Sequence, residues 1–193
     1  GLILMQDDAA REINLVNEFQ SKSKVPLMIG MDAEWGIFQR IATAHKFPWA
    51  MTLGAIQDKN LIAEMAAKIA EDCKRMGINW DFAPVVDVNT NPNNPIIGNR
   101  SFGSEVTNVV NSALAYSNGL QDHNILAAIK HFPGHGDTNT DSHLDLPVVS
   151  HDLKRLNEIE LAPFKTLMDK GIGGVMVAHL YVPALEKEKG IRA

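Results

Sequence analysis

Short, mainly apolar runs alternate with amphipathic stretches along the whole 193-residue chain. The apolar runs predict buried strands at residues 2–5, 26–31, 78–88, 125–129 and 174–179. Between them, apolar positions recur every three or four residues and predict helices at 9–19, 61–76, 105–121 and 153–169. Gly77 and Gly171 follow two of these helices, where glycine commonly ends a helix.

Strands that are apolar on both faces and separated by helices are typical of a buried parallel sheet. The alternation alone fits either a doubly wound open sheet or a (β/α)8 barrel. Polar residues, however, follow the strands at Asp32, Asp87, Lys130, His131 and His179. The carboxyl ends of barrel strands meet at one mouth, whereas an open sheet would spread these side chains along a line. We therefore predict an α/β fold of the (β/α)8 TIM-barrel type.

The pattern shows only five strands, and a barrel of this type has eight. Residues 1–5 already form a predicted core strand, and the sequence has no starting methionine. We therefore expect residues 1–193 to be one domain that is part of a larger catalytic barrel, with about five of its eight strands present.

Composition excludes several other classes of protein. Hydrophobic residues make up 45% of the chain and charged residues 21%, as in ordinary globular domains. The net charge of −5, without a basic cluster, argues against nucleic-acid binding. No apolar run in the sequence is long enough for a membrane span. The single cysteine, Cys73, excludes an internal disulfide but leaves the compartment open between cytoplasm and periplasm. The sequence also leaves the oligomeric state open.

Residues 129–147 contain most of the candidate chemistry. The string K-H-F-P-G-H-G-D-T occupies positions 130–138, and D-S-H follows at 141–143. The segment holds three of the seven histidines and several carboxylates, but few residues that could form a core. A strand that leads into such a loop is a common way of presenting reactive side chains.

These two motifs resemble the signature of family 3 glycoside hydrolases, most closely that of their β-N-acetylglucosaminidase branch. Three further strings are similar in the expected order: D-A-E-W-G at 32–36, P-V-V-D-V at 84–88 and G-N-R-S-F-G at 98–103. The resemblance implies that the five strands are the second to the sixth of the barrel. It also implies a carbohydrate substrate, namely terminal β-linked N-acetylglucosamine in peptidoglycan- or chitin-derived saccharides. Hydrolysis would retain the anomeric configuration and need no cofactor.

In that branch an Asp-His dyad is the acid/base, so the resemblance implies His143 as the proton carrier and Asp141 as its partner. An imidazole can donate a proton near neutral pH, and a nearby carboxylate can orient it. Without the resemblance, an isolated D-x-H is a weak signal. The family's nucleophilic aspartate follows the seventh strand, which this sequence does not include. We therefore expect the chain by itself to be inactive.

The resemblance also implies a set of side chains that bind the substrate sugar. Asp32 would accept hydrogen bonds from sugar hydroxyls, and Lys130 and His131 would contact the sugar in the first subsite. Arg100 lies between two glycines and Arg40 lies eight residues after Asp32, both at positions of substrate-contacting arginines. By its sequence context, Arg40 fits a surface helix almost equally well.

Three other positions have less direct interpretations. Trp35 stands where the family usually has a second glycine, which leaves the shape of this loop and the width of the sugar pocket open. Asp87 and His135 are interpreted as supports of the neighbouring loops.

A metal-dependent barrel hydrolase is an alternative reading. His131, His135, Asp137 and His143 offer nitrogen and oxygen ligands of the kind that zinc prefers. Against this reading, such enzymes have a histidine pair on an early strand, and G-M-D at 30–32 contains none.

A non-catalytic sugar-binding module is the second alternative. Asp32, Arg100, Lys130 and His131 could bind a sugar without cleaving it. Against this reading, an open sheet of five strands would expose apolar edges and promote aggregation.

Overall fold

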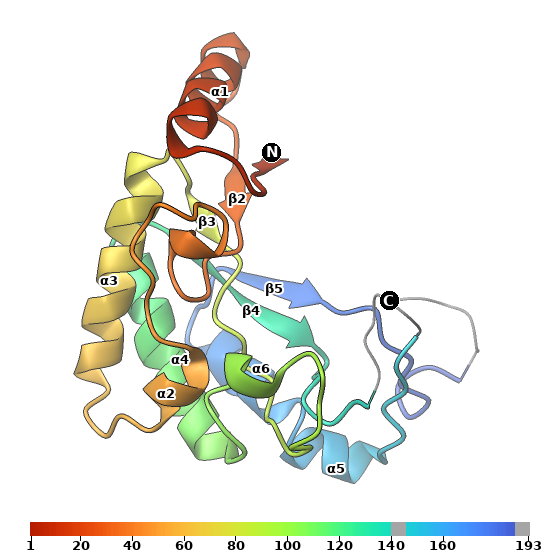
Figure 1. The fold of residues 1–193 in the computed structure, drawn as a ribbon. Helices are drawn as coiled ribbons and strands as arrows, with labels where there is room; N and C mark the ends of the chain where they lie inside the picture. Colours follow the sequence, from red (N-terminus) through yellow and green to blue (C-terminus); the bar gives the residue numbers. More distant parts are fainter. Residues whose placement is uncertain (140–145, 188–193) are drawn as a thin grey trace.

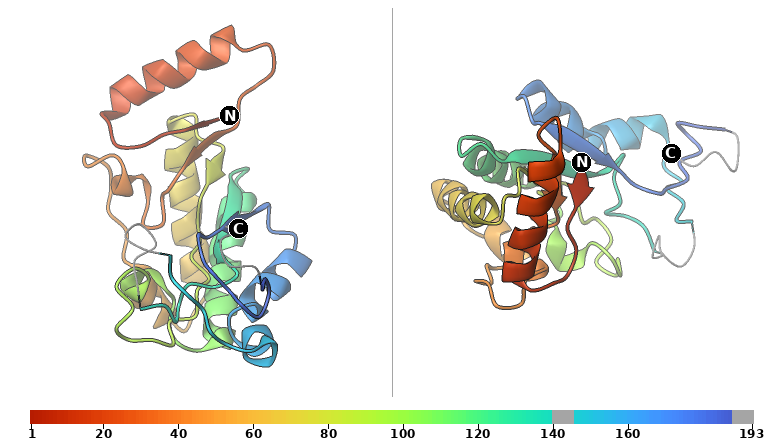
Figure 2. Two further views of the ribbon diagram at one scale, coloured as in Figure 1. Left: turned by 90° about the vertical axis from the view of Figure 1, so that its right-hand side faces the viewer. Right: turned by 90° about the horizontal axis from the view of Figure 1, so that it is seen from above.

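The computed structural model describes residues 1–139 and 146–187. At its centre lies a parallel sheet whose strands are ordered as they occur along the chain (Figure 1). They are β1 (Leu2–Ile3), β2 (Ile29–Met31), β3 (Trp80–Asp81), β4 (Leu126–Phe132) and β5 (Gly174–Val177). The pairing runs from Leu2 opposite Ile29 to Phe132 opposite Val177. The sheet curls like part of a barrel wall (Figure 2), so the predicted truncated (β/α)8 fold is confirmed.

Helices connect the consecutive strands, as parallel pairing requires. They are α1 (Ala9–Lys22), α2 (Ala50–Gly54), α3 (Asn60–Arg75), α4 (Val106–Gln121), α5 (Leu153–Glu158) and α6 (Ala162–Asp169), with two 3₁₀ turns, η1 (Ile37–Gln39) and η2 (Gly98–Arg100). Helices α3 and α4 pack side by side, and α6 packs beside α4 (Figures 1 and 2). Among the helices described, none combines the length and the apolar character that crossing a membrane would need.

The main core lies between the sheet and helices α3, α4 and α6. Ile62, Val109 and Phe164, one from each of these helices, are completely buried. Helices α3 and α4 approach closely at Gly119, where an added Cβ would lie 2.3 Å from the carbonyl oxygen of Ala63. A larger residue at this position would force the two helices apart, so Gly119 is needed for the close packing of α4 against α3.

The strand predicted at 78–88 is shorter than expected. Only Trp80–Asp81 form a continuous ladder, and the chain rejoins the sheet through a bridge between Val85 and Lys130. Pro84 lies just before that bridge and has no N–H to donate to a ladder. Despite the interruption, Asp87 lies beside the end of β4, where its carboxylate is 2.7 Å from Nδ1 of His131.

The helix predicted at 153–169 is divided into α5 and α6. Pro163 stands in the first turn of α6, where a proline is tolerated because that N–H has no helical partner. Inside a continuous helix the same ring would clash with the preceding turn. Helix α2 was not predicted, since five residues are too few to show a helical period.

Candidate active site

Five alternating charges lie together at the carboxyl ends of β2 and β4. The Lys130 ammonium is 2.8 Å from Oδ1 of Asp32 and 2.8 Å from Oε1 of Glu34. Arg40 pairs with Asp32 at 2.5 Å, and Arg100 donates to both oxygens of Glu34 at 2.7 and 2.9 Å. We call these five side chains the charge array. Lys130 is only 1% exposed and Glu34 only 7%. Their contacts with opposite charges offset the cost of burying these two charges.

The charge array keeps its carboxylates ionised. Burial acts to raise the pKa of Glu34, but the charge of Lys130 and the hydrogen bonds from Arg100 outweigh it and lower the pKa to about 2. Burial acts in the same direction on Asp32, and there Lys130 and Arg40 together hold the pKa below its ordinary value. The array therefore presents fixed donors and acceptors to a polar ligand.

Asp87 holds the ring of His131 in place. Its completely buried carboxylate accepts hydrogen bonds from the backbone N–H of His131 at 3.2 Å and of His135 at 2.6 Å, and lies 2.7 Å from Nδ1 of His131. Burial acts to raise the pKa of Asp87, but His131 and the backbone hydrogen bond outweigh it and lower the pKa. Since an ionised carboxylate only accepts, Nδ1 of His131 bears the hydrogen, and Nε2 faces the guanidinium of Arg100 at 3.2 Å.

The loop after β4 packs tightly against the segment after β3. At Gly136 an added Cβ would lie 1.9 Å from the carbonyl oxygen of Val88, so a side chain cannot be placed there. The amide of Asn94 donates to the carbonyl oxygen of His135 at 2.8 Å, and Nδ1 of His135 lies 2.5 Å from Oγ1 of Thr138. Burial lowers the pKa of His135. These contacts agree with the interpretation of His135 as a support of the loop.

The charge array, His131 and His135 line one pocket of about 580 Å³, within the range of roughly 300–1,000 Å³ usual for small-molecule sites. The residues predicted to bind sugar all contribute to its wall: Asp32, Arg40, Arg100, Lys130 and His131. His179 lines the same pocket. The structure thus brings together the polar residues that follow different strands, and Arg40 contacts Asp32 rather than lying on a surface helix. Their roles in sugar binding stay a prediction.

The predicted acid/base residues, Asp141 and His143, lie outside the residues that the structure describes. Asp137, which precedes them, contacts Nε2 of His151 through its carboxylate. The catalytic assignment of Asp141 and His143 therefore stays a prediction.

Two residues of the site were not predicted from the sequence. Glu34 lies two positions after Asp32. Side chains two positions apart in extended backbone point to the same side, so this spacing could have indicated that the two carboxylates lie together. Tyr116 lies on α4, and its hydroxyl is 3.1 Å from the carbonyl oxygen of Ala33 and 3.2 Å from that of Glu34. The Tyr116 hydroxyl thus fixes the backbone that directly follows Asp32. No local pattern reveals a contact across 83 positions of sequence.

The Tyr116 contact leads to a first prediction. Replacing Tyr116 with phenylalanine is expected to lower the free energy of unfolding by about 1–2 kcal/mol, because two buried carbonyl oxygens lose a partner. Urea unfolding of the natural-length protein measures the change. Ser112, one helical turn earlier, is buried and its hydroxyl has no partner among the described residues. The control Ser112→Ala should therefore cost less than Tyr116→Phe, and equal costs would contradict the assigned contact.

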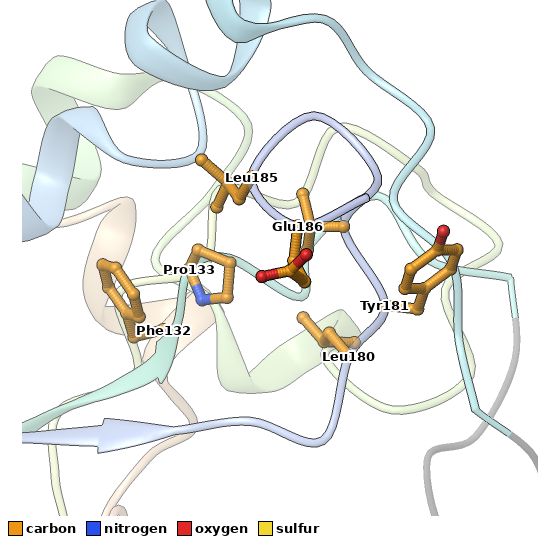
Figure 3. A pocket seen from close by; sticks show the side chains of 7 residues that line it. Phe132, Pro133, Leu180, Tyr181, Leu185 and Glu186 are labelled. Atoms are coloured by element: carbon orange, nitrogen blue, oxygen red, sulfur yellow. The ribbon is translucent and has the colours of Figure 1, made fainter. Parts of the chain in front are cut away.

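A second pocket, of about 280 Å³, lies beyond the end of β4 (Figure 3). Its described lining is mainly apolar: Phe132, Pro133, Leu180, Tyr181, Val182, Leu185 and Glu186. Glu186 is the single carboxylate in this lining. The combination of opposite charges that suits a polar ligand occurs in the larger pocket, which we take as the candidate active site.

The metal-dependent alternative requires a cluster of ligating side chains. In residues 1–139 and 146–187, no three side chains of histidine, cysteine, aspartate or glutamate come close enough to hold a metal ion. His131 and His135, two of the candidate ligands, instead contact Asp87 and Thr138. His143 lies outside the described residues.

Comparisons with known proteins agree with the fold. "Beta-hexosaminidase A" of Pseudoalteromonas piscicida is 39% identical over the whole of this chain and 35% of its own length. "Beta-hexosaminidase LpqI" of Mycobacterium bovis is 38% identical over 83% of this chain and 42% of its own length. The chain thus spans between a third and a half of the length of these curated relatives.

Two solved structures are also similar. A family 3 β-N-acetylglucosaminidase from Paenibacillus sp. superposes with a TM-score of 0.90 at 40% identity, covering 98% of this chain and 38% of that one. NagZ from Neisseria gonorrhoeae, in complex with N-trifluoroacetyl-D-glucosamine, gives 0.90 at 31% identity, covering 97% and 58%. The family model described as "Glycosyl hydrolase family 3 N terminal domain" matches residues 4–192. The chain therefore belongs to glycosyl hydrolase family 3, in its N-terminal domain.

Proposed function

We propose that the protein containing this chain is a glycoside hydrolase that removes terminal β-linked N-acetylglucosamine from peptidoglycan- or chitin-derived saccharides. The main support is the charge array, which lies beside His131 in one pocket of a family 3 domain. The names of the curated relatives and the sugar derivative in the Neisseria structure support the same substrate class.

The charge array suits a neutral ligand rich in hydroxyl groups. Asp32 can accept hydrogen bonds from two adjacent hydroxyls, which would fix the orientation of a sugar ring. Lys130, Arg100 and Arg40 can donate to oxygen atoms of the sugar, and Nε2 of His131 is held toward the pocket by Asp87. Because the array already balances most of its own charge, the ligand needs none. We assign Asp32, Arg40, Arg100, Lys130 and His131 to the terminal sugar.

Proton transfer is assigned to His143, oriented by Asp141, and the nucleophile to an aspartate of the natural protein beyond Ala193. The nucleophilic carboxylate attacks the anomeric carbon while His143 protonates the leaving glycosidic oxygen. His143 then removes a proton from water, which displaces the carboxylate and releases the sugar with its configuration retained. The acid, the base and the nucleophile all belong to the protein, so the reaction needs no cofactor.

The test is hydrolysis of β-N-acetylglucosaminides by the natural-length protein and its His143→Ala variant. The variant should lose about 100-fold in kcat/KM on a saccharide and recover much of that loss on an activated aryl leaving group, which needs no proton. The matched control is His123→Ala. His123 lies between α4 and β4, at the amino end of the strand and away from the pocket, so this variant should behave as wild type.

Two results would contradict the proposal in different ways. Absence of hydrolysis by the wild-type protein would overturn the glycosidase function. Equal losses of the His143→Ala variant on both leaving groups would overturn the acid/base role alone.

A further inference from the structure

Two tryptophans stand together at the edge of the candidate active site. The indole of Trp35 packs on that of Trp49, with ring centroids 4.1 Å apart and an angle of 42° between the planes. Trp35 directly follows Glu34 of the charge array, and its carbonyl oxygen accepts a hydrogen bond from the N–H of Phe47 at 3.2 Å. Both indoles are half-buried. The position of the Trp35 ring is therefore restricted by its contact with Trp49 and by the hydrogen bond to its backbone carbonyl.

Trp35 lines the candidate active site, and Trp49 does not. Asp32, Lys130 and His131 provide charged and polar atoms to this pocket, whereas Trp35 and Ile96 provide apolar surface. The pocket therefore combines a polar region with an apolar one. A single sugar ring that occupies the charge array leaves the apolar region without an assigned ligand.

The shape and chemistry of a flat indole select among possible ligands. A pyranose presents hydroxyls at its edge and C–H groups on its faces, and the negative face of an indole attracts such C–H groups. The methyl group of an N-acetyl substituent would fit best in a small enclosed hollow. The Trp35 ring is instead broad and half-buried, and a second ring packs behind it. The geometry favours stacking of a complete ring.

We propose that Trp35, held by Trp49, forms a second sugar subsite that stacks on the sugar ring linked to the terminal one. The ligand class is a β-linked amino-sugar disaccharide or longer saccharide. This inference rests on the proposed function and adds the part of the substrate that leaves. Trp35 stands where the family resemblance leads us to expect glycine, so the subsite does not follow from the resemblance.

The test compares two substrates of the natural-length protein that share the terminal sugar. N,N′-diacetylchitobiose has a second sugar ring, whereas trifluoroethyl N-acetyl-β-glucosaminide has a leaving group without a ring. Trp35→Ala should lower kcat/KM about tenfold on the disaccharide and leave it within about twofold on the ring-free glycoside. Retained hydrolysis of the ring-free glycoside also shows that the variant folds.

Two further variants sharpen the comparison. Trp35→Phe keeps an aromatic face and should recover most of the disaccharide activity. Phe38→Ala removes an aromatic side chain from the same segment that is not part of the pocket wall, and should leave the ratio of the two kcat/KM values unchanged.

Failure of the subsite differs from failure of the proposed function. Equal losses of Trp35→Ala on both substrates would overturn the subsite and place Trp35 against the terminal sugar itself, and unchanged activity on both would overturn it as well. No hydrolysis of either substrate by the wild-type protein would overturn the proposed function, and the subsite with it.

Discussion

Replacing Lys130 with methionine should lower the free energy of unfolding by about 3–5 kcal/mol and abolish sugar binding. Lys130 is 1% exposed, and its ammonium is the shared partner of Asp32 and Glu34. Methionine fills a similar volume but leaves two carboxylates facing each other with less compensation. We attribute the expected loss of stability to the missing ammonium charge, because methionine keeps most of the apolar volume of the lysine side chain.

Chemical unfolding of the natural-length protein measures this change. Lys68→Met is the matched control, since Lys68 pairs with Glu71 on the exposed face of α3 and should contribute less than about 1 kcal/mol. Adding Glu34→Gln to Lys130→Met should recover part of the loss, with a coupling energy of about 0.5–3 kcal/mol. A cost of Lys130→Met no larger than that of Lys68→Met would contradict the role of the buried pairing.

Replacing Asp81 with asparagine should remove a large pH dependence of stability. Asp81 is completely buried on β3, and burial raises the pKa of its carboxyl from 3.8 to about 7, despite the hydrogen bond from the N–H of Ala33. Between these two values the folded protein binds a proton that the unfolded chain releases. Stability therefore falls as pH rises from about 4 to 7, by up to about 4 kcal/mol from this group, and levels off above 7.

The measurement is urea unfolding of the wild type and Asp81→Asn between pH 4 and 8. Asparagine cannot ionise, so the variant should gain stability relative to the wild type as pH rises. Asp122→Asn, at an exposed position after α4, controls for the loss of one carboxylate. A difference between Asp81→Asn and the wild type that stays constant with pH would show that Asp81 is ionised throughout.

The sequence allowed the convergence of Asp32, Lys130, His131 and His179 to be predicted, because parallel strands place their carboxyl ends at one edge. Hydrophobic periodicity also located helices α3 and α4 to within a few residues. The details that depend on individual prolines were less visible, since Pro84 and Pro163 interrupt elements that their apolar patterns favour.

The tertiary pairs of the site could not be predicted from local patterns. Glu34 acquires its role from Arg100, 66 positions away, and Asp81 was read only as part of an apolar strand. Such contacts depend on how strands and helices pack, and sequence spacing within one element does not report that packing. Burial, which determines the pKa values of Asp81 and Glu34, is likewise a property of the assembled fold.

The sharing of partners in the charge array has a consequence for how this protein can diverge. Asp32 and Glu34 each contact two cations, and Lys130 contacts both carboxylates, so a single replacement removes a partner from at least one neighbouring buried charge. Stepwise drift at these positions passes through costly intermediates, and change requires linked substitutions. Trp35 follows Glu34 directly but pairs with another ring. New substrate preferences can therefore arise at that neighbouring position while the array stays unchanged.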